Sequence, residues 1–223
     1  MLTRHEEKYI ISYRQYLQLL QRARQLLTAD EHGDGGTYTI TSIYYDDPAD
    51  TGLSEKLDGL KLHSKFRVRT YDYNTAFVRL ERKDKLGILT NKRSARIRWE
   101  QLAQLTQPHF WERLDGEARD LLQQMQSSQQ RPVVAVRYVR DAFCHAGSDF
   151  RLTFDRELEA LPPDADALCD PDFRGIPVLG AGDVVMEVKY GSCQPAFMRR
   201  LTAVQAQQLS LSKYALCRVK IGV

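Results

Sequence analysis

Cysteine is scarce in this sequence and widely spaced. The 223 residues include four, Cys144, Cys169, Cys193 and Cys217, and no two of them form a CxxC pair. Closely spaced pairs are typical of zinc sites and of thioredoxin-type redox sites, so their absence argues against both. Isolated cysteines in a reducing compartment remain free thiols, which is the state we expect for these four.

Long hydrophobic runs are also missing. No window approaches the roughly 18 consecutive apolar residues that a membrane-spanning helix needs. The first residues, MLTRHEEKYIIS, carry charges where a signal peptide has its apolar segment. From these two absences we expect a soluble, cytoplasmic protein with no membrane segment of its own.

A large excess of charge of one sign is absent too. The formal net charge is +3, so the chain is not a general polycation that coats nucleic acid through bulk electrostatics.

The glycine-rich segment 33–36 lacks the lysine of a phosphate-binding loop, and it lacks the strand before and helix after such a loop. No repeat of solenoid length is visible, and a hydrophobic content of 43% over 223 residues suffices for one domain spanning residues 1–223.

Two spacings in the sequence predict its secondary structure. Alternation with β-branched and aromatic residues predicts strands, and apolar residues three and four positions apart predict helices. Ser12 stands where the first helix would have its N-cap. The expected strands are residues 3–12, 37–45, two within 65–83, 89–99, 133–144, 150–156, 183–190 and, as a possible last strand, 216–221. The expected helices are residues 13–27, a short helix or irregular crossover in 49–59, 100–106, 110–125 and 195–208.

This order of elements indicates an α+β fold. Hairpin connections imply an antiparallel sheet of eight or nine strands, and the spread of the strands along the chain favours one domain. An open sheet with one strongly charged face is unfavourable. We therefore expect a closed antiparallel eight-stranded β-barrel, with charged residues lining a hydrated interior and helices packed outside.

The strongest functional signal lies in residues 65–93, KFRVRTYDYNTAFVRLERKDKLGILTNKR. Side chains alternate between the two faces of a strand, so one face carries three cations on the first strand. On the next strand the same face carries a cation, an acid and a cation. The residues on this face are Lys65, Arg67, Arg69, Arg79, Glu81 and Lys83.

Other strands repeat the arrangement. Each such pattern alone is common on solvated strands, but here several separate strands carry it. Buried like charges are costly without a partner, phosphate oxygens suit Arg and Lys, and Mg²⁺ or Mn²⁺ often bridges carboxylates to phosphates. The sequence therefore predicts a polyanion bound with a divalent metal. The further residues on this face are Arg4, Glu6, Lys8, Glu187, Lys189, Arg151, Thr153, Asp155, and either Tyr138 with Arg140 or Arg137 from the opposite parity.

An ordered set of motifs extends along nearly the whole chain: RHEEKY, SIYYD, KFRVRTY, LERK, NKR, MEVKY and SKY. Together they resemble the catalytic domain of the vacuolar transporter chaperone (VTC) polyphosphate polymerases, within the triphosphate tunnel metalloenzyme superfamily. The resemblance covers residues 3–221. It implies an eight-stranded antiparallel tunnel that binds triphosphate with Mn²⁺ or Mg²⁺, in which the γ-phosphate of ATP is moved onto a polyphosphate chain.

The resemblance also implies roles for individual residues. The expected catalytic residues are Arg67, Arg69, Lys83, Lys189 and Lys213. The expected phosphate-binding residues are Lys8, Lys92 or Arg93, Arg140 and, because they share the charged face, Lys65 and Arg79. The expected metal-binding residue is Glu187, followed by Glu6 and Glu81.

One departure from the superfamily pattern helps to place the chain. The CYTH-type signature at the N-terminus is E-x-E-x-K, whereas Arg4 replaces the first acid here. This change removes a metal ligand and adds a cation that can hold phosphate, which favours the polymerase-like branch. No Ser-His-Asp or Cys-His set is recognisable, in agreement with catalysis by positioning and electrostatics rather than through a covalent protein intermediate.

Three alternatives remain open. A tripolyphosphatase or nucleoside triphosphatase would use the same fold, and a non-catalytic polyphosphate sensor would keep the cations without a productive metal site. A nucleic-acid binder is disfavoured because aromatic residues do not interleave with the basic face. If the cations only repel one another, Arg67→Ala or Lys83→Ala should abolish activity and leave the melting temperature unchanged or raised.

Overall fold

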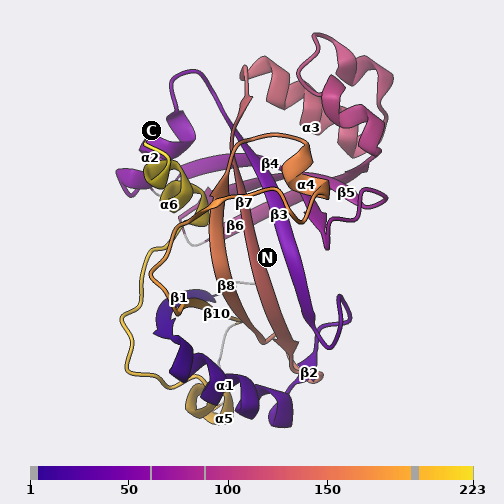
Figure 1. The fold of residues 1–223 in the computed structure, drawn as a ribbon. Coiled ribbons are helices and arrows are strands. Elements are labelled where there is room, and N and C mark those ends of the chain that lie inside the picture. The colour runs from indigo at the N-terminus through magenta and orange to yellow at the C-terminus, as the bar shows by residue number, and fades with distance from the viewer. Residues whose placement is uncertain (1–4, 61, 88, 192–195, 223) are drawn as a thin grey trace. The chain divides into compact units, whose positions relative to one another are not determined.

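The structure, a computed structural model, describes residues 5–60, 62–87, 89–191 and 196–222 (Figure 1). Its strands are β1 (His5–Ser12), β2 (Thr28–Ala29), β3 (Thr37–Asp46), β4 (Leu62–Tyr71), β5 (Val78–Leu86), β6 (Leu89–Ile97), β7 (Arg131–Cys144), β8 (Arg151–Leu161), β9 (Ile176–Pro177) and β10 (Asp183–Tyr190). Its α-helices are α1 (Tyr13–Leu26), α2 (Thr51–Leu57), α3 (Gly116–Ser127), α4 (Asp166–Cys169), α5 (Ala196–Leu201) and α6 (Lys213–Lys220), and its 3-10 helices are η1 (Trp99–Gln104) and η2 (Phe110–Arg113).

The strands form one ten-stranded sheet, which confirms the predicted α+β class. The main path runs β1-β10-β8-β7-β3-β4-β5-β6, while the short strands β2 and β9 pair with β7 and β8. The path therefore ends at β1 on one side and at β6 on the other. Among the described residues no hydrogen-bonded ladder joins these two ends, so the predicted closed eight-stranded barrel is not confirmed.

The chain divides into two compact units, each built from separate segments. Unit 1 contains residues 1–39, 138–158 and 179–211, and unit 2 contains residues 40–137, 159–178 and 212–223. The strands β3, β7 and β8 each contribute residues to both units.

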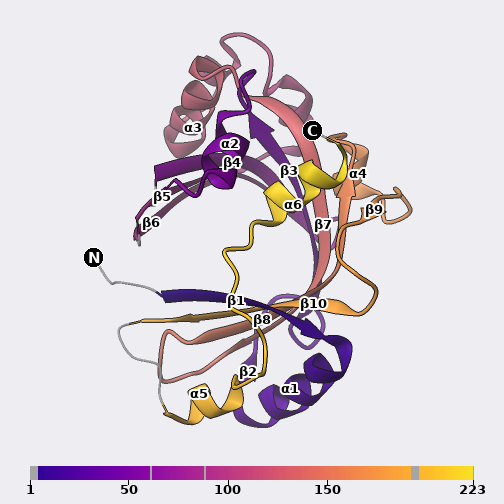
Figure 2. The same ribbon diagram turned by 90° about the vertical axis from the view of Figure 1, so that its left-hand side faces the viewer.

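Unit 1 is a sheet with one apolar and one charged face. Leu19 and Leu20 of α1 pack on the apolar face with Phe154 and Met186 of the sheet, and all four are buried. The helix begins where the sequence predicts, because the Ser12 hydroxyl accepts from a backbone N–H of the first turn in a capping box. Figure 2 shows α1 and α5 on the same side of β1, β8 and β10.

Unit 2 repeats this arrangement with other elements. Phe66, Val68 and Leu80 lie on the face of β4 and β5 that packs against Leu121 and Leu122 of α3. Figure 2 shows α3 covering this face. Side chains alternate between the two faces of a strand. The charged residues at the alternate positions of β4 and β5, which the sequence predicts to share one face, therefore point away from α3.

The predicted last strand is wrong: residues 216–220 belong to α6, and Ile221 is the C-cap of this helix. Tyr214, Cys217 and Arg218 are buried at helical spacing, and the Ser212 hydroxyl accepts from the N–H of Ala215 as an N-cap. The run of apolar residues is too short for its period to be read from the sequence alone, because a buried helix and a buried strand look alike over so few residues.

The predicted helix over residues 195–208 is shorter than expected. The described part of it ends at Leu201, and the chain beyond becomes extended. Gln208 forms a bridge with Tyr9 of β1, and the N–H of Leu209 donates to the carbonyl of Lys8. Pairing with the edge strand thus competes with continuation of the helix.

Within the described residues no helix has the length and apolar content to cross a membrane.

Candidate functional site

One face of β4, β5 and β6 in unit 2 is lined with cations. Lys65 lies opposite Lys83, and Lys83 lies opposite Lys92 on the next strand. Four residues further along β4 from Lys65, Arg69 lies opposite Arg79 of β5. We call the following six residues the cationic face: Lys65, Arg67, Arg69, Arg79, Lys83 and Lys92.

Glu81 is the carboxylate at the centre of the cationic face. Two guanidinium nitrogens of Arg67 lie 2.7 Å from Oε2 of Glu81, and Nζ of Lys92 lies 2.5 Å from its Oε1. Burial alone would raise the pKa of Glu81, but the charges of Arg67, Arg69 and Lys92 outweigh it and lower the pKa to about 2. Glu81 is therefore ionised at neutral pH and neutralises part of the face.

Two hydroxyl groups of β3, the strand that pairs with β4, contact arginines of the cationic face. Arg69 donates from Nε to the Ser42 hydroxyl at 2.9 Å, and Arg67 donates from Nη1 to the Tyr44 hydroxyl at 3.2 Å. Burial raises the pKa of Tyr44, but Arg67, Arg69 and Lys65 lower it further than burial raises it, to about 8. The Tyr44 phenol is thus an unusually acidic group placed among the side chains of the cationic face.

The start of α6 meets the other end of the cationic face. Lys65 donates from Nζ to the Ser212 hydroxyl at 3.1 Å and lies 4.8 Å from the ring centre of Tyr214. Lys213 is the first residue of α6 and directly follows this capping serine. The geometry therefore brings the expected catalytic residue Lys213 to the strand that carries Lys65, Arg67 and Arg69.

A buried polar network holds α6 in place. The Tyr214 hydroxyl donates to the Asp46 carboxylate in a very short hydrogen bond, and Arg218 donates to the Tyr214 oxygen at 3.1 Å. Nη2 of Arg218 also lies 2.9 Å from Oδ1 of Asp50. Asp46 in turn accepts from the backbone N–H of Gly52 at 2.9 Å. The network links α6 to β3 and α2, and so fixes the position of Ser212 and Lys213.

Unit 1 has a different charged group on the polar face of β1 and β10. Glu6 lies opposite Lys189, and Lys8 lies opposite Glu187. Nζ of Lys8 lies 2.6 Å from Glu6 and 3.7 Å from Glu187, while Lys189 forms an ion pair with Glu187. We call these four residues the acid–lysine quartet. It brings together two expected metal-binding residues, the expected phosphate-binding residue Lys8 and the expected catalytic residue Lys189.

Arg140 and Asp155 continue the polar face of unit 1. Nε and Nη2 of Arg140 donate to the two carboxylate oxygens of Asp155 at 2.6 and 2.9 Å. Burial lowers the pKa of Arg140, but Asp155 raises it well above the ordinary value. Of the two alternatives left open on this strand, Arg140 is the one on the polar face. Arg137 instead donates to Glu159 in unit 2.

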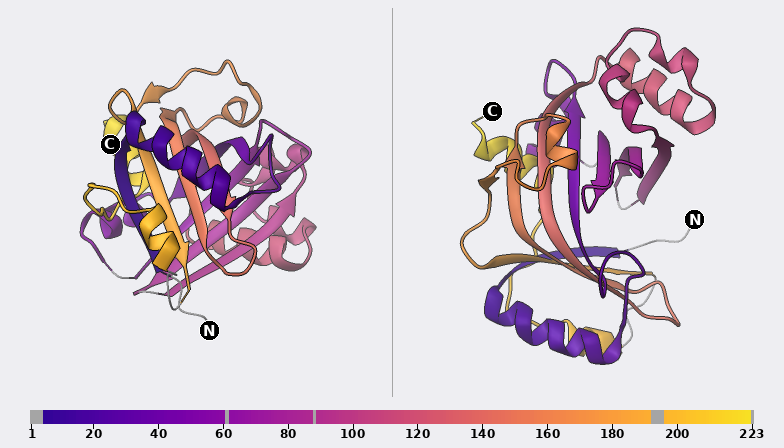
Figure 3. Two further views of the ribbon diagram at one scale, coloured as in Figure 1. Left: turned by 90° about the horizontal axis from the view of Figure 1, so that it is seen from below. Right: turned by 45° about the vertical axis from the view of Figure 1, so that its right-hand side comes forward.

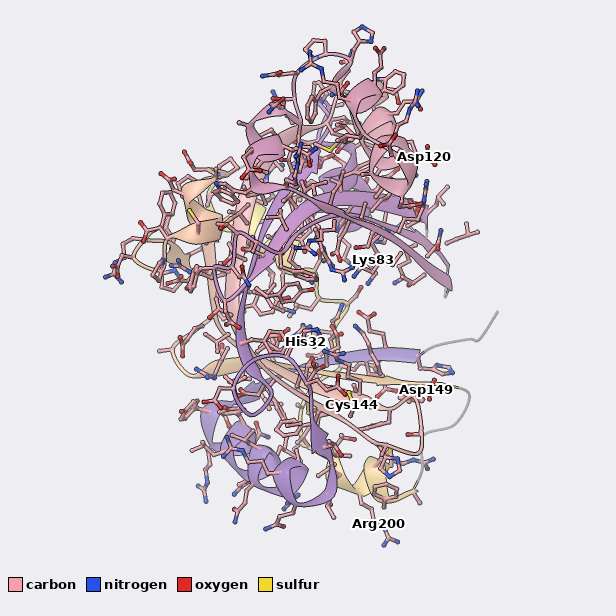
Figure 4. The ribbon with its side chains drawn as sticks, turned by 90° about the vertical axis from the view of Figure 1, so that its right-hand side faces the viewer. His32, Lys83, Asp120, Cys144, Asp149 and Arg200 are labelled. Atoms are coloured by element: carbon pink, nitrogen blue, oxygen red, sulfur yellow. The ribbon has the colours of Figure 1, made fainter. Side chains whose placement is uncertain are left out.

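The structure also separates Lys92 from Arg93. Lys92 binds Glu81 in the cationic face. Arg93 points toward α3, with Nε 2.6 Å from Glu117 and Nη2 3.4 Å from Asp120. Figure 4 shows Lys83 and Asp120 on opposite sides of the strands. Of the pair offered by the NKR motif, only Lys92 lies with the other expected phosphate-binding residues.

Four residues that the sequence did not single out belong to this site: Ser42, Tyr44, Ser212 and Tyr214. The signal for the first two was present, since they occupy alternate positions of one strand within the SIYYD segment. What was missing was the register that places them opposite Arg69 and Arg67. Tyr214 lies in the SKY motif, just before the segment 216–221 that was expected to be a strand, so its place within a helix was not predicted.

The donor set of the quartet fits a divalent metal that takes part of its coordination from phosphate. Among the described residues no group of three or more His, Cys, Asp or Glu is arranged to hold a metal, but Mg²⁺ commonly uses one or two carboxylates together with phosphate oxygens. Glu6 and Glu187 both contact Lys8. Thr153 lies opposite Glu187, and its buried hydroxyl has no hydrogen-bond partner in the described residues. Such a hydroxyl suits a metal-bound water or a phosphate oxygen.

Several solved structures share this fold at low sequence identity. A "putative adenylate cyclase" from Bacillus halodurans is 15% identical with a TM-score of 0.54, covering 95% of this chain and 96% of that chain. Another from Vibrio parahaemolyticus is 12% identical with a TM-score of 0.51, covering 96% and 97%. The PH1819 protein of Pyrococcus horikoshii OT3 is 10% identical with a TM-score of 0.51, covering 97% and 96%. At these identities the likeness establishes the fold alone.

Comparison of the sequence with curated proteins gives no match. A family model described as the VTC domain matches residues 3–220, nearly the same stretch over which the motifs resemble this family. Because the match covers almost the whole chain, the protein belongs to the VTC domain family.

Proposed function

We propose that this protein is a metal-dependent phosphotransferase that moves the γ-phosphate of ATP onto a polyphosphate chain. The observation that carries the proposal is the cationic face, in which six Lys and Arg side chains surround a single buried carboxylate, Glu81. One acid cannot neutralise six cations, so the face is complete only with an anion of several negative charges. Family membership and the shared fold support a triphosphate as this anion.

The cations of unit 2 have defined tasks in this proposal. The guanidinium groups of Arg67 and Arg69 are oriented by Glu81 and Ser42, so they meet phosphate oxygens with little reorganisation. Lys83 and Lys92 add point charges on the neighbouring strands, and Lys213 adds one from the start of α6. These groups stabilise charge on the equatorial oxygens of the phosphoryl group in transit and hold the acceptor in line.

The quartet of unit 1 has the residues for the metal. Glu187 and Glu6 would hold Mn²⁺ or Mg²⁺, and Lys8 and Lys189 would contact the phosphates. Bound there, the metal would neutralise phosphate charge. In the protein alone these carboxylates form ion pairs with the two lysines, so both acids already lie beside the cations that would contact the phosphates.

The test is incubation with ATP and Mn²⁺, with and without a short polyphosphate primer, followed by gel separation of the products. Chains longer than the primer are expected. Arg69→Gln should lower the rate by at least about 100-fold, since it removes a charged contact from the transition state. Arg113→Gln, which removes an exposed arginine of the same unit, should leave the rate unchanged. The absence of any lengthened chain under all these conditions would contradict a polymerase.

The same assay separates the remaining alternatives. Release of inorganic phosphate without polymer would identify a triphosphatase. Tight binding of tripolyphosphate with no turnover, unchanged by Glu187→Gln, would identify a sensor. Under the proposal Glu187→Gln weakens metal activation, while Glu157→Gln, at a carboxylate whose side chain is 65% exposed, leaves the metal dependence as it is in the wild type.

A further inference from the structure

The two helices on the outside of unit 1 have an unusual composition. Together α1 and α5 contain five arginines and no Asp or Glu. Since the whole chain has a net charge of +3, the rest of the protein has a net charge of −2. The basic charge of the protein is therefore concentrated on these helices, apart from the local clusters of the candidate site. The five arginines are Arg14, Arg22, Arg24, Arg199 and Arg200.

These arginines differ from several arginines of the sheet because they have no acidic partner in the part of the chain that the structure describes. All five are exposed, and none forms an ion pair with another described residue. Arg93, Arg137, Arg140 and Arg156 each bind a carboxylate. Unpaired arginines in one region create a positive potential that favours an anionic partner. Figure 4 shows Arg200 at the outer end of unit 1, pointing away from the sheet.

Apolar side chains are interspersed with the five arginines. Tyr13 and Leu17, one turn apart on α1, are 50% and 48% exposed, and Phe197 on α5 is 42% exposed. Leu26 is 54% exposed at the end of α1. The two helices are in contact with each other, and Figure 3 shows them side by side when the molecule is viewed from below. Arginines and apolar residues thus share one surface, which we call the arginine surface.

A shallow polar depression opens on the arginine surface between α1 and the segment after α5. Its volume is about 210 Å³, and it is lined by Gln15, Gln18, Leu19, Arg22, Ala203, Val204 and Gln205. The Gln15 amide is engaged by Ser12 and the Gln205 carbonyl, whereas the side chains of Gln18 and Arg22 carry donors for phosphate and carboxylate oxygens. The depression therefore suits a small anionic head group.

We propose that the arginine surface docks unit 1 on an anionic lipid bilayer. Arginines supply the attraction to negatively charged head groups, each contributing at short range. The exposed aromatic and aliphatic side chains enter the boundary between head groups and acyl chains. A soluble polyphosphate chain would use the arginines but leave Tyr13, Leu17 and Phe197 in water, so the mixture of charge and apolar surface favours a membrane. This inference is independent of the proposed function.

The test is sedimentation of the full chain with vesicles of phosphatidylcholine alone or mixed with phosphatidylserine. The wild type should bind the mixed vesicles, bind neutral vesicles far less, and lose binding as salt rises. The triple variant Arg14→Gln, Arg22→Gln, Arg24→Gln should lose on the order of 100-fold in affinity. The control Arg113→Gln, Arg119→Gln, Arg174→Gln removes the same charge from exposed positions of unit 2 and should bind as the wild type does.

A second variant tests the apolar part of the surface. Leu17→Ser with Phe197→Ser should weaken vesicle binding several-fold and leave its salt dependence in place. Equal melting temperatures and an unchanged rate with ATP in solution would show that each variant is folded and that its active site is intact. Three outcomes would overturn the proposal: no binding of wild type to mixed vesicles, equal loss in the two triple variants, or a loss of polyphosphate or nucleic-acid binding in the α1 variant with vesicle binding intact.

Discussion

Arg67 and Glu81 face each other directly across β4 and β5, with two guanidinium nitrogens 2.7 Å from one carboxylate oxygen. The Glu81 side chain is 1% exposed, so water does not screen this pair appreciably. The repulsion expected among the cations is therefore partly relieved before any ligand binds. Arg67 has a structural role in addition to its proposed role in phosphate binding.

This pair changes the expected behaviour of Arg67→Ala. Removing the guanidinium leaves a buried carboxylate with Lys92 as its remaining close ion-pair partner, which should lower the free energy of unfolding by about 3 kcal/mol. Lys83→Ala should leave stability unchanged or raise it, because Lys83 lies opposite the like charges of Lys65 and Lys92. Both variants should lose activity.

Urea unfolding of the two variants without ligand measures this difference. Since one cation is removed in each case, the change in net charge is the same and the variants control for one another. Equal stabilities would mean that the contact of Arg67 with Glu81 contributes nothing beyond general electrostatics.

The contribution of ionised Glu81 to the free energy of unfolding should be measurable from its loss at low pH. The pKa of this carboxyl lies at about 2 in the folded protein against an ordinary 4.5, so the unfolded state takes up a proton at higher pH. Its stabilisation is complete above about pH 4.5 and is lost as the pH falls toward 2, a change of about 3 kcal/mol. Unfolding free energies measured across this range should therefore depend less steeply on pH in Glu81→Gln than in the wild type. The exposed control Glu157→Gln should retain the steep dependence.

Tyr44 should ionise near pH 8, whereas the ordinary pKa is 10. Its folded-state pKa lies below that of the unfolded chain, so the free energy of unfolding should gain a contribution that grows between about pH 8 and 10. Phenolate absorbance during a pH titration should show one tyrosine ionising near pH 8, and Tyr44→Phe should remove that step. Bound tripolyphosphate should shift the step upward, because it neutralises the cations that lower the pKa. A first ionisation near pH 10 would contradict the assignment.

Arg140 and Asp155 allow stability and function to be tested apart. Arg140→Met leaves a fully buried carboxylate without its bidentate partner, and should cost about 3–5 kcal/mol. The double variant Arg140→Met, Asp155→Leu should recover most of this stability, since no unpaired charge remains. Activity should stay low in both if Arg140 binds phosphate. Recovery of activity together with stability would limit Arg140 to a structural role.

The network behind α6 can be tested through Tyr214. Tyr214→Phe removes the donor to Asp46 and should cost about 1–2 kcal/mol in unfolding free energy. It should also raise KM for ATP more than it lowers kcat, because Lys213 and Ser212 would be held less firmly. Tyr13→Phe alters a half-exposed tyrosine of unit 1 and serves as the control. An unchanged KM with reduced stability would separate the network from substrate binding.

The charged strands were predictable from the sequence because their pattern is local. Alternation placed Lys65, Arg67 and Arg69 on one face, and the structure gives their β5 partners the same parity. The N-cap at Ser12 and the strand Asp183–Tyr190 were equally local and are confirmed. Each of these predictions needed only the period of a single element.

Predictions that depended on distant pairing were less successful. The parity of NKR left Lys92 and Arg93 as alternatives, and only the position of α3 with Glu117 separates them. Metal binding by Glu81 stays a prediction, and its carboxylate contacts with Arg67 and Lys92 could not be read from the sequence. Closure of the sheet depended on the two edge strands, which no local pattern determines.

The pairing of β1 with β10 has a consequence for synthesis of the chain. His5 pairs with Tyr190, and Ser12 pairs with Asp183, so β1 leaves the ribosome long before its partner exists. The β4, β5 and β6 hairpins, by contrast, join neighbouring segments and can form as they emerge. Unit 2 therefore has a nucleus available during translation, whereas β1 must wait with an unpaired edge until β10 is made, and the nascent chain is most exposed to aggregation during that interval.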